Sequence, residues 1–153
     1  MLERLKNVFA RVPEATPATN ADRLRIATCV VLMEVARADD EFSAVERERI
    51  VAALRQRFAL SEAEAQELIE TSAGARSNHH DLWHFTHTIN EASSPDEKRQ
   101  IIEEVWRVIY ADKTLDAHED YLVHKLAKLL NLNHPQLIEA KMAVKGEQGP
   151  AAD

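Results

Sequence analysis

Residues 38–46 read Ala38-Asp39-Asp40-Glu41-Phe42-Ser43-Ala44-Val45-Glu46, a stretch that ends one apolar run and opens another. A second stretch, Ala111-Asp112-Lys113-Thr114-Leu115-Asp116-Ala117-His118-Glu119, is placed in the same way 73 residues later. We call these the first and second acidic motifs. Carboxylate positions and apolar positions both recur at this one offset, which predicts a duplicated helical hairpin.

The rest of the chain is patterned for helices. Apolar residues recur at a spacing close to 3.6, and only 3 glycines and 5 prolines interrupt them. We therefore predict an all-α, compact single-domain bundle of seven to eight helices with an internal repeat of helical hairpins. The expected helices cover residues 21–38, 44–58, Ser61 to near Gly74, 81–92, Pro95 onward, 117–130 and 134–144. Asn20, Ser61 and Ser94 are the expected N-caps outside the acidic motifs.

The 153 residues fit one domain. Residues 1–19 are predicted to form an N-terminal amphipathic helix and a linker, residues 20–145 the helical domain, and residues 146–153 a disordered tail. The single cysteine, Cys29, lies in an apolar run and is expected to be buried, which excludes a disulfide framework for the monomer.

Charge and hydropathy narrow the classes of function. No stretch reaches 18 apolar residues and no secretory signal is evident, so we expect a cytoplasmic protein that does not itself span a membrane. The net charge of −7 argues against binding to nucleic acid, which requires a basic surface. Cations and protein partners fit this charge better, and the sequence leaves the oligomeric state open.

The acidic motifs have two interpretations. Ser43 with Glu46, and Asp116 with Glu119, have capping-box spacing, so both motifs could simply start helices. Capping does not explain Asp39, or Asp112 in the second motif. Each follows the end of a helix, where the helix dipole disfavours a negative charge.

The alternative to capping is a divalent cation site. Its ligands would be carboxylates from both motifs, namely Asp39, Glu46, Asp112, Asp116 and Glu119. Glu41 is a further candidate donor. Carboxylate oxygens favour calcium or magnesium over zinc. Neither motif has the length of an EF-hand loop, and no pattern for an organic cofactor is present.

The two motifs, with Asp81-Leu82-Trp83-His84-Phe85-Thr86-His87-Thr88-Ile89-Asn90-Glu91 between them, resemble the tellurite-resistance TerB family. The resemblance extends from about Asp22 to Ala143. It implies a bundle of seven or eight helices in an intracellular bacterial protein. It further implies a role in metal stress linked to membrane-bound partners, a metal-binding cluster formed by the paired acids, and no catalytic activity.

Three further features have competing interpretations. His80, His84, His87 and Glu91 share one helix face, which is either a zinc site or, as we expect, a solvated polar face. Glu34 interrupts an apolar helix, either as part of an ion pair or polar edge or as an acid lining a pocket. Both tryptophans, Trp83 and Trp106, are expected to fill core or hairpin-contact space.

These patterns support two hypotheses of different kinds. The first is a non-catalytic divalent-cation-binding module that passes its metal state to a protein partner. The second is a metal-independent protein-interaction module whose acidic surface docks a basic partner. A metal-dependent hydrolase ranks below both, because the sequence contains no identifiable substrate-binding group.

Overall fold

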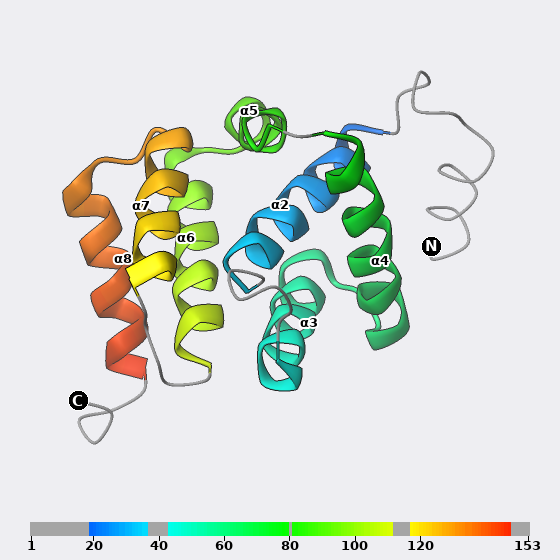
Figure 1. Ribbon diagram of the computed structural model, residues 1–153, viewed down its shortest axis with the longest axis horizontal. Helices are drawn as coiled ribbons and strands as arrows, with labels where there is room; N and C mark the ends of the chain where they lie inside the picture. Colours follow the sequence, from blue (N-terminus) through cyan, green and yellow to red (C-terminus); the bar gives the residue numbers. More distant parts are fainter. Residues whose placement is uncertain (1–18, 37–42, 80, 112–116, 148–153) are drawn as a thin grey trace.

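The computed structural model describes residues 19–36, 43–79, 81–111 and 117–147. The described residues form seven α-helices and no strand, which confirms the all-α prediction. Figure 1 labels the helices in chain order. Their bounds are α2 Asn20–Ala36, α3 Ala44–Phe58, α4 Glu62–Asn78, α5 Trp83–Ala92, α6 Pro95–Tyr110, α7 Ala117–Leu129 and α8 His134–Glu147.

Helix α2 is the central element. Its residues from Ile26 to Met33 are all buried, because apolar side chains occupy most sides of this helix. It packs against α3 and α4 on one side of the molecule, against α6 and α7 on the other, and against α5. Figure 1 shows α2–α4 and α6–α8 as two groups of helices, with α5 between them at one edge.

Ion pairs define the directions of the outer helices. Arg99 binds Glu139 at 3.5 Å, and Arg107 binds Glu147 at 2.6 Å, so α6 and α8 run parallel. Helix α3 runs antiparallel to α6. Arg49, near the start of α3, binds Glu104 in the second half of α6 at 3.2 Å, and Arg57, at the end of α3, donates a hydrogen bond to the first turn of α6.

Two helix-to-helix turns share one geometry. Between α3 and α4, Ala59 has a φ of 55°, and between α7 and α8, Asn131 has a φ of 61°. The next residue is a buried leucine in both turns. The Leu60 amide donates to the Arg55 carbonyl, and the Leu132 amide donates to the Ala127 carbonyl. A residue in the left-handed conformation, followed by a residue whose amide donates to the carbonyl five positions earlier, is typical of a Schellman C-cap.

The predicted capping boxes at α3, α4 and α6 are confirmed, with Ser43, Ser61 and Ser94 as the caps. At α8, Asn133 and Gln136 exchange the equivalent bonds, at 2.8 and 2.9 Å.

Some predicted helix boundaries were wrong. The cap of α2 is Thr19 rather than Asn20, because the Thr19 hydroxyl accepts the Asp22 amide while the Asn20 side chain accepts a bond from an arginine. Helix α4 continues through Gly74 to Asn78. Helix α8 continues to Glu147, where the pair with Arg107 secures its last turn, so the predicted tail begins too early.

Burial follows the predicted pattern with one exception. Trp106 is fully buried as expected, but Trp83 is 53% exposed on the first turn of α5. Helix α5 presents Phe85 and Ile89 to the core, and Trp83 lies on its opposite side. Among the described residues, no helix combines the length and apolar character needed to cross a bilayer. The predicted N-terminal helix lies outside the described residues, as does most of the predicted tail.

Candidate functional site

Glu46 of the first acidic motif is a buried carboxylate in the first turn of α3, with 6% of its surface exposed. Its Oε1 atom accepts a hydrogen bond from the Ser43 amide at 2.8 Å, and its own amide donates to the Ser43 hydroxyl at 3.1 Å. The capping interpretation of this residue is therefore confirmed. The cap uses one of the two carboxylate oxygens, so capping does not exclude metal coordination by the other.

Glu119 of the second acidic motif occupies the matching place in the first turn of α7 and is 4% exposed. Buried carboxylates are unusual, because moving a negative charge out of water is costly unless a partner compensates for it. Both motifs thus place a glutamate in a buried position at the start of a helix.

The other predicted ligands, Asp39, Asp112 and Asp116, lie outside the described residues, as does Glu41. Among the residues that are described, no group of three or more histidine, cysteine or acidic side chains is arranged to hold a metal ion. The described part of the predicted centre therefore consists of Glu46 and Glu119. Their carboxylates are the donor type that calcium and magnesium prefer, so the two residues fit such an ion in chemistry.

The antiparallel packing of α3 and α6 relates the two motifs in space. Glu46 lies one turn before Arg49, which binds Glu104 in the second half of α6. The second motif follows directly after α6 in the sequence. The start of α3 and the end of α6 lie at the same edge of the molecule (Figure 1).

A charged network extends from this edge across three helices. Glu104 binds both Arg49 of α3 and Arg107 of α6, each at 3.2 Å, and Arg107 also holds Glu147 of α8 through two hydrogen bonds of 2.8 and 2.6 Å. The hydrogen bonds from Arg107 lower the pKa of Glu147, and those bonds raise the pKa of Arg107 in turn. Sequence analysis missed this network, although the spacing of Glu103 and Glu104 from Arg107 indicates contacts within the helix.

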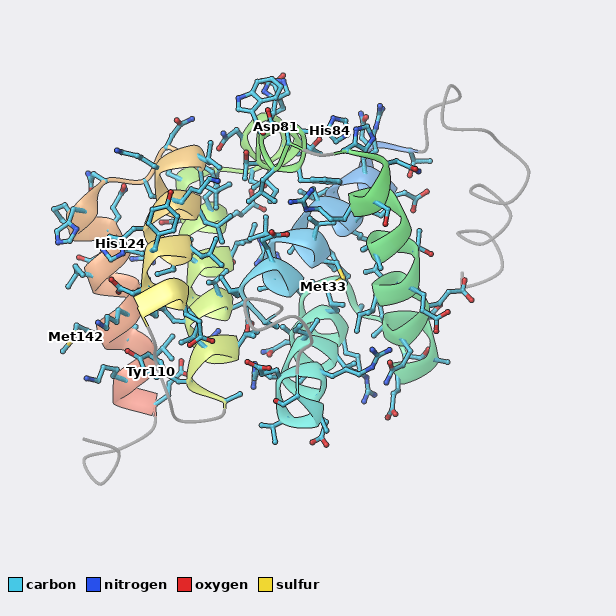
Figure 2. The ribbon with its side chains drawn as sticks, in the orientation of Figure 1. Met33, Asp81, His84, Tyr110, His124 and Met142 are labelled. Atoms are coloured by element: carbon cyan, nitrogen blue, oxygen red, sulfur yellow. The ribbon has the colours of Figure 1, made fainter. Side chains whose placement is uncertain are left out.

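The histidine-rich segment is a solvated face, as expected. His84 and His87 are exposed, and the His79 and His84 rings are stacked with their centroids 3.8 Å apart. Partial desolvation of the ring, followed by the neighbouring His79 and His87, lowers the pKa of His84, so its neutral form is favoured. Figure 2 labels His84, in the first turn of α5, and Asp81, just before this helix, at the edge of the bundle. His80 lies outside the described residues.

Cys29 and Glu34 have structural environments. Burial raises the pKa of the Cys29 thiol to about 12, and its Sγ lies 3.6 Å from the Met33 sulfur, so it is a poor nucleophile. Glu34 forms an ion pair with Arg76 of α4 at 3.0 Å, which confirms the ion-pair interpretation.

The model of the family described as "Tellurite resistance protein TerB" matches residues 25–142. The chain belongs to the TerB family. This match begins within α2, ends within α8 and confirms the resemblance found in the sequence. Both acidic motifs, and therefore Glu46 and Glu119, lie inside the TerB region.

A solved structure shows the same fold. It is the crystal structure of a protein of unknown function from Porphyromonas gingivalis W83, with a TM-score of 0.62 and 15% sequence identity. The alignment covers 85% of this chain and 93% of that chain. No curated protein matches the sequence.

Proposed function

We propose that this TerB-family protein is a non-catalytic module that binds a divalent cation through its two acidic motifs. The proposed ligands are Glu46 and Glu119, which lie within the described residues, together with Asp39, Asp112 and Asp116, which lie outside them. The observation that carries the proposal is the burial of both glutamates, each in the first turn of a helix. A bound cation would interact favourably with the charge of both carboxylates, in addition to the partners that they have within the protein.

An internal repeat is part of the proposal, because a repeat would place the two acidic motifs in equivalent positions, each between the first and second helices of its half. Three observations support it. Helices α3 and α7 start at Ala44 and Ala117, which are separated by the same 73 residues as the motifs. The turns after these helices share a Schellman geometry, and α2 and α6 each pack closely against the last helix of their own half.

The expected ion is calcium or magnesium rather than zinc, because hard carboxylate oxygens are the donors. The family description names tellurite resistance, which is the basis for proposing a role in tellurite-type metal stress. A cytoplasmic location is part of the same proposal. In that role the metal state would be passed to a protein partner, which could belong to a membrane-associated complex. No organic cofactor and no catalytic step are part of this proposal.

Thermal unfolding of chelator-stripped protein with calcium, magnesium, manganese or zinc tests the metal site. An ion at 100 times its dissociation constant adds about 2.7 kcal/mol to the stability of a one-site protein. We expect selective stabilisation by one of the hard cations, and loss of this response in the Glu46→Gln/Glu119→Gln variant.

The matched control is Glu64→Gln/Glu97→Gln. These two glutamates occupy the same capping-box position in α4 and α6 but lie outside the acidic motifs. The control should keep the full cation response. The proposal is wrong if no ion stabilises the protein, or if the control loses the response to the same extent.

The capping box at α3 favours a second function, a metal-independent interaction module. There, Ser43 and Glu46 only start the helix and the acidic surface docks a basic partner. This hypothesis predicts no cation response. It also predicts that the Glu46→Gln/Glu119→Gln variant and its control bind a basic partner with equal affinity. Any loss of affinity would come from the two negative charges that each variant lacks.

A further inference from the structure

The α7–α8 hairpin carries a surface groove that plays no part in the proposed metal site. Its volume is about 490 Å³, within the usual range for binding pockets. Buried Ala127, Leu132 and Leu137 form an apolar floor, and exposed Tyr121, Lys125 and Lys128 line it as well. The groove therefore combines an apolar base with a basic rim.

The positive rim is unusual in a chain with a net charge of −7. No acidic side chain is among the described residues that line the groove. Within the described part of the protein, Lys125 and Lys128 form no ion pair. His124 and His134 add two further nitrogen-bearing rings, with centroids 6.0 Å apart. Figure 2 labels His124 on this hairpin, on the side of the molecule away from α2–α4.

A second groove, between α3 and α6, provides a contrast. It has a similar volume of about 460 Å³, but it contains both signs of charge. There Arg107 binds Glu104, and Arg57 donates to Gln100, so its polar groups satisfy one another. In the α7–α8 groove, His124 contacts the Asp120 carboxylate at 3.7 Å, whereas Lys125 and Lys128 form no ion pair with another described residue. An external anion could pair with these two lysines.

We propose that the α7–α8 groove docks an acidic segment of a partner protein. One large apolar side chain of that segment would enter the floor, and its carboxylates would face Lys125 and Lys128. Tyr121 is 64% exposed beside the floor, and aromatic residues in this position are common anchors of protein interfaces. Charge complementarity around an apolar centre would give the interface its specificity.

A peptide fits this groove better than a membrane or a nucleic acid. Membrane-binding helices present a long apolar face flanked by many basic residues, whereas here two lysines surround a concave floor. Nucleic acids require a larger basic surface than this acidic chain offers. The docking proposal does not depend on the metal site.

Binding of two fluorescent helical peptides to the full chain, with chelator present, tests the proposal. One peptide carries leucine on one face and glutamate elsewhere, and the other replaces each glutamate with lysine. We expect anisotropy to show binding of the glutamate peptide only, and weaker binding at high salt.

Variants locate the binding. The Lys125→Glu/Lys128→Glu variant should bind the glutamate peptide about tenfold or more weakly, since two attractive charge pairs become repulsive. Tyr121→Ser should also weaken it, with little risk to folding because this side chain is exposed. The matched control, Arg23→Glu/Lys145→Glu, makes the same change in net charge outside the groove and should bind almost normally.

Several results would overturn the proposal. These are equal binding of both peptides, no binding of the glutamate peptide, and equal losses in the groove variant and its control. Tighter binding to phosphatidylserine vesicles than to the peptide would assign the groove to a membrane. Self-association in sedimentation experiments that Tyr121→Ser abolishes would assign it to a second copy of the chain.

Discussion

The two halves of the bundle, α2–α4 and α6–α8, fasten their first and third helices with the same kind of contact but with opposite charges. In the first half, Glu34 in the last turn of α2 binds Arg76 in the last turn of α4. In the second, Arg107 in the last turn of α6 binds Glu147 at the end of α8. The difference teaches that a cross-helix ion pair of either polarity can join the first helix of a group to the third, with the arginine on α4 in one case and on α6 in the other.

The two pairs are not equally embedded. Arg107 also lies 3.2 Å from Glu104 and 3.8 Å from Glu103, so one guanidinium serves three carboxylates. Arg76 binds Glu34 and the His79 carbonyl. The second half therefore concentrates more negative charge around Arg107 than the first half does around Arg76. Four predictions break or sharpen this comparison.

The largest effect is expected in the core of the second half. Trp106 is fully buried in α6, and the residue at the same offset in α2 is the smaller Met33. We expect Trp106→Ala to cost about 3–5 kcal/mol in urea unfolding, because the ring leaves a large cavity. Trp106→Met, which copies the first half, should cost less, since methionine adapts to irregular space. If Trp106→Met lost as much stability as Trp106→Ala, methionine could not replace tryptophan in the second half, and the cores of the two halves would be packed differently.

Removing each arginine should give a smaller and unequal effect. Arg107→Met leaves Glu103, Glu104 and Glu147 without their shared cation and is expected to cost about 2 kcal/mol. Arg76→Met should cost about 1 kcal/mol, because it strands only Glu34. Chemical denaturation measures both. A larger loss for Arg76→Met would reverse the proposed ranking of the two halves.

The paired turns offer a reciprocal test. Ala59 adopts a left-handed conformation that alanine disfavours, whereas Asn131 tolerates the same conformation. Ala59→Gly should therefore stabilise the protein by about 0.5–1 kcal/mol. Asn131→Ala should destabilise it by a similar amount. Thermal unfolding would contradict this account if both substitutions changed stability in the same direction.

The smallest effect concerns pH. Arg107 lowers the pKa of Glu147 below its ordinary value of 4.5 in the folded protein. A carboxyl with a lowered folded-state pKa stabilises the fold above its unfolded-state pKa, and this contribution is lost as pH falls through the folded-state value. NMR titration should show the Glu147 pKa moving upward in Arg107→Met. Arg76→Met is the control and should leave this pKa unchanged.

Local features of the fold could be predicted from the sequence because they depend on residues close in the chain. The capping boxes at Ser43, Ser61 and Ser94 each involve residues three positions apart, and all three are present. The apolar character of α2 likewise indicated its central place. The cap of α2 was misplaced by one residue, since Thr19 and Asn20 are both suitable caps and only the backbone decides between them.

Features that depend on helix register could not be predicted. The partners Arg49 and Glu104 are 55 residues apart, and Lys128 of α7 and Leu137 of α8 line the same groove from two different helices. At the candidate metal site, the sequence selected Glu46 and Glu119, and both prove to be buried. Their burial could not be read from the motif, because a capping glutamate can equally be exposed, as Glu97 is.

The shared position of α2 has a consequence for folding. Because this helix contacts helices of both halves, neither half can separate without uncovering the apolar surface of α2. The two groups of helices should therefore melt as one cooperative unit rather than as two modules. In native-state hydrogen exchange, the amides of α2 should open last, and their exchange should report the global free energy of unfolding.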